Sequence, residues 1–251
     1  MPTTRVDLHV KVLDETVVRR AKAAGVDVLV YAPHFTRLPD IRERAAAFSD
    51  EDLLVVPGRE LFTGSYRDRK HVLAVGLNEG VPDFVTLDGA LTELERQGAA
   101  VLAPHPDFLT VSLTPADVEA YRDRLDGVET YNPKHLPHHD QRARRVADAH
   151  DLPQFGSSYA HLPGSVGQVW TEFDADIDSA TALVDALQSG VSRSVHHEDG
   201  TGHYRHRLAE KLHLVYENTW EKVDRLLLSG MEPTHPRHIA YDGRFDDVAV
   251  Y

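Results

Sequence analysis

The stretch RVDLHVKVLDE, residues 5–15, alternates apolar and polar side chains with the period of a β-strand that buries one face. Its valines and leucine face a core at alternate positions, so Asp7, His9 and Lys11 point together to the opposite side. A histidine beside a carboxylate is a candidate metal ligand. Lys11 needs a different explanation, because a protonated lysine has no lone pair to offer a metal ion.

Strand and helix patterns alternate along most of the chain after this first strand. The strand pattern DVLVYAPH at 27–34 precedes a helical pattern at 38–48, and AAVLAPHP at 99–106 precedes another at 114–125. Strands that alternate with helices of this length predict βαβ units and a mostly parallel sheet. About seven such repeats favour a closed, TIM-like α/β barrel over an open doubly wound sheet. No glycine-rich dinucleotide-binding loop follows the first strand, which also disfavours the open sheet.

The composition is acidic, with 40 Asp and Glu residues against 27 Lys and Arg residues and a net charge of −13. Only six of the basic residues are lysines. An acidic, lysine-poor surface suits a salt-rich cytoplasm, where screening reduces self-repulsion, so we expect a halophilic, cytoplasmic protein. An acidic protein from a mesophile with a GC-rich genome is the alternative. Either surface disfavours broad nucleic-acid binding, which depends on positive charge.

The sequence excludes cysteine-based sites and lacks the apolar run of a membrane span. The 251 residues contain no cysteine, which excludes disulfides and thiolate chemistry and leaves His, Asp and Glu to hold any metal. No apolar run approaches the roughly 18 residues of a membrane span, so we expect no membrane association. We expect one barrel domain over residues 1–230 and a C-terminal tail at 231–251, rich in Pro, Gly and Asp, that is docked or partly flexible.

Histidines and carboxylates gather where the predicted strands end. A single histidine in such a place is usually a hydrogen-bonded structural residue. Several of them at one rim of a barrel form instead the ligand set of Zn, Mn or Fe. The residues in question are His9, His34, Glu60, His105, Glu129 and His161.

His71 begins its strand pattern instead of ending it. The connection from Leu61 to Lys70 is too short for a helical crossover, so the two strands around it should form a hairpin. A hairpin returns the start of one strand to the end of the previous one, and this predicts that His71 lies beside Glu60.

An ordered set of short motifs then resembles the polymerase and histidinol phosphatase (PHP) domain family. The motifs occur in the family's order and spacing across residues 6–161. They are DLHVK, VYAPH, PGRELF, HVLAVGL, APHP, VETYN and GSSYAH. The resemblance implies a distorted seven-stranded (βα) barrel and a metal-dependent phosphoesterase, a hydrolase that usually holds two or three metal ions.

Three positions depart from the family pattern. The first motif is normally D-L-H-x-H, and Lys11 replaces its second histidine. The second usually reads D-H, but Pro33 precedes His34. The last usually reads S-D-A-H, and Tyr159 replaces its aspartate.

The resemblance implies three ligand sets, of which one is complete. The first metal would be bound by Glu60, His71 and His105, the second by His34 and His161 together with Asp14 or Glu15, and the third by His9 and Glu60 with two ligands replaced by Lys11 and Tyr159. We therefore expect one or two divalent ions (Zn, Mn or Fe) and none at the third site. Glu129 and Tyr159 are further candidates for ligands or for groups that orient them.

Lys11 points to the side where the third ion would be. Its ammonium could neutralise Glu60 or hold a substrate phosphate, and we expect its Nζ within hydrogen-bonding reach of Glu60 or the Tyr159 hydroxyl. The alternative is a solvated lysine on the outer rim. Catalytic roles are expected for Lys11, Glu60 and His105.

Weaker candidates for phosphate contacts lie elsewhere. Lys134 and His135 belong to the loop NPKHLPHHD after Glu129, which is otherwise expected to be a solvated polar loop. Arg205 precedes the last predicted helix, and the alternative there is an exposed helix start.

The resulting hypothesis is a metal-dependent hydrolase of phosphoesters that activates water. Its substrate would be a small phosphomonoester, a nucleotide or an oligonucleotide end. The alternative is a non-catalytic barrel that retains a metal for stability or for ligand sensing.

Overall fold

The computed structural model describes residues 2–65, 68–108, 111–198 and 233–250. Within these ranges the chain alternates strands and helices, as the sequence predicts. The strands are β1 (Thr4–Val10), β2 (Val28–Tyr31), β3 (Leu54–Ser65), β4 (Asp68–Val75), β5 (Ala100–Ala103), β6 (Gly127–Tyr131), β7 (Gln154–Gly156), β8 (Val169–Phe173) and β9 (Arg193–His197). The α-helices are α1 (Glu15–Ala23), α2 (Leu38–Phe48), α3 (Leu87–Arg96), α4 (Pro115–Tyr121), α5 (Pro137–Ala149) and α6 (Ala180–Gln188).

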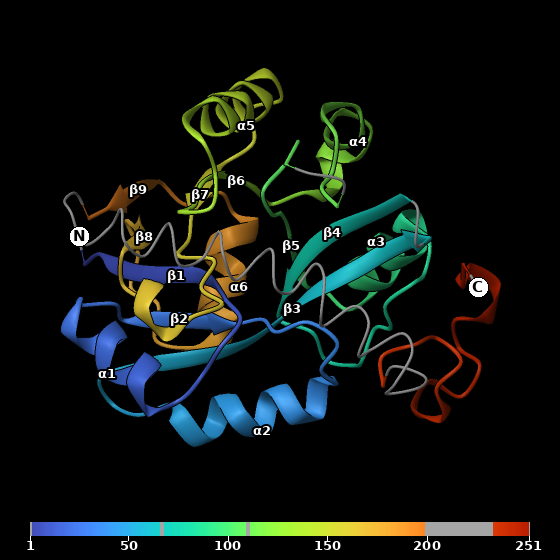
Figure 1. The fold of residues 1–251 in the computed structure, drawn as a ribbon, viewed down its shortest axis with the longest axis horizontal. Coiled ribbons are helices and arrows are strands. Elements are labelled where there is room, and N and C mark those ends of the chain that lie inside the picture. The colour runs from blue at the N-terminus through green and yellow to red at the C-terminus, as the bar shows by residue number, and fades with distance from the viewer. Residues whose placement is uncertain (1, 66–67, 109–110, 199–232, 251) are drawn as a thin grey trace.

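All of these strands join one sheet in the order β7-β6-β5-β4-β3-β2-β1-β8-β9. Pairing is parallel from β1 to β3 and from β5 to β7, and antiparallel where β4 meets β3 and β5. Several helices, including α1, α2, α4 and α5, lie around the outside of the strands (Figure 1). The α/β barrel class is therefore confirmed.

The strand count differs from the expected seven, because the described sheet has nine strands. The strands β8 and β9 continue the sheet beyond β1 in antiparallel pairing. They bring the far end of the sheet back to β7, where a Cβ on Gly156 would lie 2.4 Å from Val195. The Thr171 hydroxyl in β8 also accepts the Gly156 N–H at 2.9 Å and donates to the Gly156 carbonyl at 2.8 Å, so the barrel is nearly closed at β7.

Local signals at the helix ends follow the sequence. The Asp14 carboxylate accepts the Val17 N–H at 2.8 Å and caps α1. Gly25, at φ +68°, ends the turn after α1 in a conformation that favours glycine. At α4, Thr114 and Asp117 form a capping box. None of the helices among the described residues is long and apolar enough to cross a membrane.

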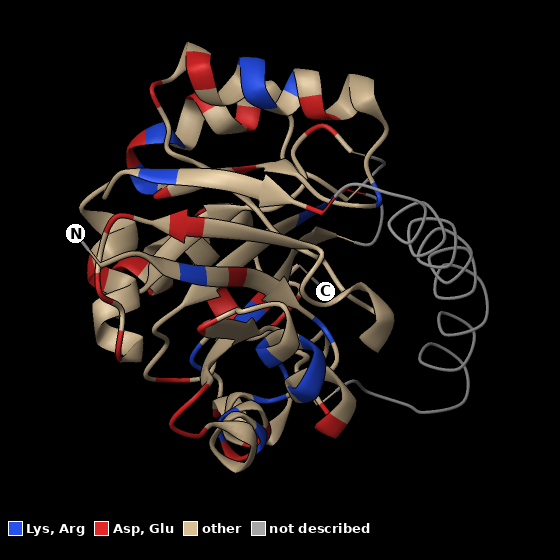
Figure 2. Cartoon of the chain, turned by 90° about the vertical axis from the view of Figure 1, so that its left-hand side faces the viewer, with Lys and Arg blue, Asp and Glu red and all other residues tan. Residues whose placement is uncertain are grey.

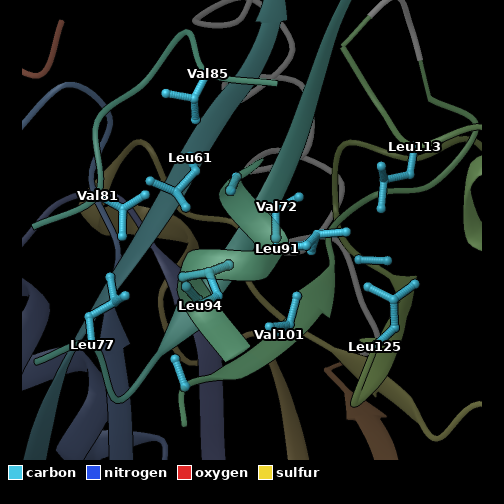
Figure 3. Packing of buried hydrophobic residues seen from close by; sticks show 14 of the residues in the cluster. Leu61, Val72, Leu77, Val81, Val85, Leu91, Leu94, Val101, Leu113 and Leu125 are labelled. Carbon is cyan, nitrogen blue, oxygen red and sulfur yellow. The ribbon is translucent and has the colours of Figure 1, made fainter. Parts of the chain in front are cut away.

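The predicted hairpin between β3 and β4 is present, with Phe62 opposite His71. One side of the hairpin packs against α3, and Figure 3 shows Leu61 and Val72 in one cluster with Leu91 and Leu94. Each fully buried leucine contributes about 1.5–3 kcal/mol relative to an exposed one. The hairpin is therefore held rigidly at the strand rim where the candidate ligands gather.

Charged residues of both signs are interspersed over helices, strands and loops (Figure 2). Some ion pairs are buried, and in one of them Arg59, which is 1% exposed, donates to the fully buried Asp83 at 2.6 Å. Asp83 also accepts the Phe62 N–H at 2.9 Å and the hydroxyl of Thr234 at 2.6 Å. The pair thus connects the hairpin to the C-terminal tail.

The described tail residues continue from this connection into the core. Tyr241 and Phe245 belong to the same apolar cluster as the hairpin and α3. Ala249 forms an isolated bridge with Val85. Residues 233–250, which include the 3₁₀-helices Ile239–Tyr241 and Asp246–Val248, therefore pack on the β3–β4 side of the barrel.

Replacing Asp83 by alanine should lower the free energy of unfolding by about 3–5 kcal/mol, because it leaves the Arg59 charge buried without a partner. Urea denaturation followed by circular dichroism measures the change. Asp40→Ala is the matched control, since it removes the exposed pair with Arg37 and should cost less than about 1 kcal/mol. Equal losses in both variants would show that the fold does not depend on the buried pair.

Candidate metal centre

The carboxylate of Glu60, near the middle of β3, is fully buried, and its two oxygens face different partners. Oε1 lies 3.0 Å from Nδ1 of His71 and 2.9 Å from Nε2 of His105. The hairpin delivers His71, as predicted, and the end of β5 delivers His105. These three residues are the group in the described part of the chain whose ligand atoms all lie within 4.8 Å of one another.

The tautomer of His105 is set by Ser112. The Ser112 hydroxyl donates to the Phe108 carbonyl, so its oxygen accepts the Nδ1–H of His105 at 3.0 Å. Nε2 of His105 then carries a lone pair and faces an oxygen of Glu60 that also carries lone pairs. Two acceptor atoms this close require a proton or a cation beside them.

The donor set fits a divalent metal. One glutamate and two histidines are a three-ligand set known from catalytic zinc sites, which keep a fourth position open for water. Ligand atoms around a tetrahedral zinc ion lie about 3.3 Å apart for bonds of about 2.0–2.1 Å, close to the contacts that Glu60 makes. Nε2 of His71 is also buried without a hydrogen-bond partner among the described residues.

Lys11 occupies the other side of Glu60. Its Nζ lies 2.5 Å from Oε2 of Glu60 and donates to the Ala32 carbonyl at 2.6 Å. The contact expected from the strand pattern is present. Lys11 is 8% exposed, so the alternative of a solvated rim lysine is wrong.

Two histidines also approach this side of Glu60. Nδ1 of His34 lies 3.1 Å from Oε2, and Nε2 of His9 lies 3.5 Å from it. The side chain of His34 is 18% exposed, whereas that of His9 is fully buried. His34 is therefore where the cluster meets solvent.

The electrostatics favour a charged carboxylate among neutral imidazoles. Burial by itself would raise the pKa of Glu60, but Lys11 and the neighbouring histidines hold this pKa well below its usual range. Burial lowers the pKa of His105 to about 4 and also lowers the pKa of His34. At neutral pH His105 and His34 therefore keep the lone pairs that a metal ion needs.

Glu129, in β6, is not part of the ligand group but holds residues that belong to it or lie beside it. Its Oε2 accepts the backbone N–H of His105 at 2.8 Å and an amide N–H of Asn132 at 3.0 Å, and its Oε1 accepts the hydroxyl of Ser157. Burial opposes ionisation, yet His9, whose Nδ1 lies 3.7 Å from Oε1, helps bring the pKa of Glu129 to about 2. These donors occupy Glu129, which holds the backbone of His105 at φ +32°.

Tyr159 fills the space between the histidines. Its backbone is at φ +44°, unusual for a bulky residue, and its ring centroid lies 4.5 Å from that of His9 and 5.0 Å from that of His105. The ring of His161 lies 4.8 Å away on another side. An aromatic ring is thus packed between His9 and His161, in the position that the family pattern gives to a ligand.

The second ligand set is not assembled as expected. The rings of His34 and His161 lie 5.8 Å apart, but the Asp14 carboxylate caps α1 and Glu15 is exposed. Neither acid belongs to a metal-ligand group among the described residues. The Asp14 carboxylate instead accepts a backbone N–H at the start of α1.

The first part of the loop after β6, residues 132–135, is buried, which corrects the expectation of a solvated loop there; residues 136–138 are exposed. Lys134 is 1% exposed and its Nζ contacts Nδ1 of His161. His135 is fully buried, with its ring nitrogens 2.9 Å from Asp140 and 3.1 Å from Asn132. Arg205 lies outside the described residues.

Sequence patterns did not reveal Ser112, Ser157 and Asn132, which orient the site. Serine and asparagine in loops have no periodic signal. Their roles become visible only through their contacts with His105 and Glu129.

Comparison with known proteins agrees with this architecture. Residues 137–192 match the sequence model of the PHP-associated family, PHP_C. No curated protein matches the chain. PsfC from Pseudomonas syringae PB-5123 is 18% identical, with a TM-score of 0.63 over 87% of this chain and 99% of PsfC.

Two further solved structures share the fold. The lesion-specific endonuclease PfuEndoQ from Pyrococcus furiosus is 14% identical, with a TM-score of 0.58 over 77% of this chain, which spans 58% of the endonuclease. An amidohydrolase from Chromobacterium violaceum is 15% identical, with a TM-score of 0.55 over 75% of this chain and 97% of its own. The family match and the shared fold confirm the resemblance to the PHP family.

Replacing Ser112 by alanine should weaken metal binding by about 10- to 100-fold, because the orienting partner of a metal-bound histidine is lost. Without Ser112, the proton of His105 can move to Nε2 and occupy the side that faces Glu60. Competition with a metal-sensitive dye measures the affinity. Ser189→Ala, at the exposed end of α6, is the control, and unchanged affinity in both variants would contradict the role of Ser112.

Proposed function

We propose that this protein is a metal-dependent hydrolase of phosphate esters with a divalent ion at Glu60, His71 and His105. The observation that carries the proposal is the approach of two lone-pair atoms, Oε1 of Glu60 and Nε2 of His105, at 2.9 Å. Ser112 fixes the lone pair on His105, and burial excludes the water that would otherwise separate the two atoms. Zn, Mn and Fe all suit this ligand set.

The bound ion would polarise a phosphoryl oxygen and lower the pKa of its water towards neutrality. Glu60 supplies the negative charge of the site, and His71 and His105 direct nitrogen atoms towards the same point. The ammonium of Lys11 neutralises Oε2 of Glu60 and leaves Oε1 for the metal ion. His34, the most exposed member of the cluster, would be the first side chain that an entering ester meets.

A second candidate function is a non-catalytic barrel that keeps one ion for stability or ligand sensing. The packing of Tyr159 between His9 and His161 favours it, because the ring occupies space that an additional ion would need. A catalytic site needs room for substrate beside the ion. Turnover of any phosphate ester would decide between the two functions.

The substrate range is best approached with a panel of esters. Small phosphomonoesters, nucleotides and oligonucleotide ends are the proposed substrates. A duplex with an abasic lesion belongs in the panel because endonuclease Q was crystallised with such a substrate, although this chain spans 58% of that protein. Each ester should be assayed with Mn, Zn, Fe and Mg. The assays should be run at low and high KCl, since the acidic composition favours a protein that works in a salt-rich cytoplasm.

Replacing Glu60 by glutamine should reduce the metal content from about one ion per chain to near zero, because the amide keeps the size but loses the charge that balances the ion. Activity on the best ester should fall about 100-fold or more, a loss of at least about 2.7 kcal/mol of transition-state stabilisation. Elemental analysis and initial rates measure the two effects. Glu119→Gln, on the exposed face of α4, is the control.

Two outcomes would contradict the proposal. Wild-type metal content in Glu60→Gln would show that Glu60 is not a ligand. Normal metal binding in the wild type with no turnover of any ester would leave the non-catalytic barrel as the function.

A further inference from the structure

A second buried ammonium lies close to the proposed metal centre. Lys134, in the loop after β6, is 1% exposed. Its Nζ contacts Nδ1 of His161 and lies 4.0 Å from the centroid of the Tyr159 ring. An ammonium over an aromatic face is stabilised by the negative face of the ring, more strongly when it is shielded from water.

Lys11, directly after β1, approaches the same ring. Its Nζ lies 6.0 Å from the centroid of Tyr159 while it contacts Glu60. Two lysines that are far apart in sequence therefore place their ammonium groups within 6.0 Å of one ring centroid. The backbone supports this arrangement, because the Lys11 N–H donates to the carbonyl of Ala160 at 2.9 Å.

Burying the ammonium groups of Lys11 and Lys134 is energetically unfavourable, and the chain uses lysine sparingly. Burying an ammonium costs several kcal/mol unless it gains partners, and the chain has only six lysines. By contrast, Lys22 and Lys70 pair with aspartates near the surface, and their side chains are 28% and 16% exposed. Two of the six lysines are thus buried beside the same aromatic ring, that of Tyr159.

His161 can add a third donor. Nδ1 of His161 lies beside both the ammonium of Lys134 and, at 3.1 Å, the carbonyl oxygen of Tyr159. An ammonium can only donate, so with Lys134 protonated Nδ1 accepts from it and the ring proton lies on Nε2. An N–H at this position can donate to an anionic oxygen, whereas it would oppose a metal ion. The same contact explains why His161 does not complete the second ligand set.

We propose that Lys11, Lys134 and His161 bind the non-bridging oxygens of a terminal phosphate, so that the substrate class is a phosphate monoester dianion and not a phosphodiester. This inference rests on the proposed function, because it assigns the substrate of the same site. The ammonium of Lys134, together with that of Lys11, which Lys11 shares with Glu60, would face the two negative charges of a monoester. A diester carries one negative charge and a second substituent, which Tyr159 and the enclosed loop would exclude.

The test is isothermal titration of the full-length protein, as purified, with inorganic phosphate, phenyl phosphate and dimethyl phosphate. Metal content is measured on the same samples. The wild type should bind the two dianions at least about tenfold more tightly than dimethyl phosphate, a difference of about 1.4 kcal/mol. Lys134→Met should remove most of this preference while the metal content stays at the wild-type level.

Two further variants keep the test decisive. Lys134→Arg retains the charge and should keep the preference for dianions, and it serves if Lys134→Met does not fold, as judged by thermal denaturation. Lys22→Met removes a lysine of α1 that pairs with Asp50 near the surface and should bind phosphate like the wild type.

The failure of this inference is distinguishable from failure of the proposed function. Undiminished dianion preference in Lys134→Met, or equal binding of dianions and dimethyl phosphate by the wild type, would overturn the inference whether or not esters are hydrolysed. Phosphate binding that depends on Lys134 in a protein with no metal or turnover would support the anion site and reject the hydrolase.

Discussion

The fully buried carboxylate of Glu60 is the constraint on which the rest of the site depends. An isolated carboxylate in a protein interior costs several kcal/mol even after relaxation. Here Lys11 neutralises Oε2, and Oε1 faces Nδ1 of His71 and the lone pair on Nε2 of His105, where a metal ion would balance the charge. Because the compensation is divided between the oxygens, one side can serve a metal while the other is neutralised by an ammonium.

Several residues around the site have strained backbone conformations. His105 and Tyr159 have positive φ angles, as do Phe35 and Phe84 nearby in the aromatic cluster with Phe62. Such conformations cost of order 1–3 kcal/mol each and persist where the surroundings over-determine them. At His105 the surrounding constraint is visible, since Glu129 accepts its backbone N–H while Ser112 holds its ring.

Replacement of metal ligands by lysine and tyrosine changes the chemistry of the pocket more than its total charge. A divalent ion binds lone pairs from several directions, whereas an ammonium only donates hydrogens. Lys11 therefore places a donor where the family pattern has a ligand, Lys134 adds a second ammonium, and the ring centroid of Tyr159 lies within 6.0 Å of both. In our proposal the site has a metal-binding half around Oε1 of Glu60 and an anion-binding half around Tyr159.

Sequence alone determined the features that follow from periodicity and strand order. Alternation in residues 5–15 placed His9 and Lys11 on one side, and the short connection before His71 predicted the hairpin that brings it to Glu60. Parallel strands also explain why their ends meet at one rim. Tertiary structure alone decided the ninth strand, the capping role of Asp14, the burial of Lys134 and the orienting role of Ser112. These features depend on loops and on contacts between distant segments, for which spacing along the chain carries no signal.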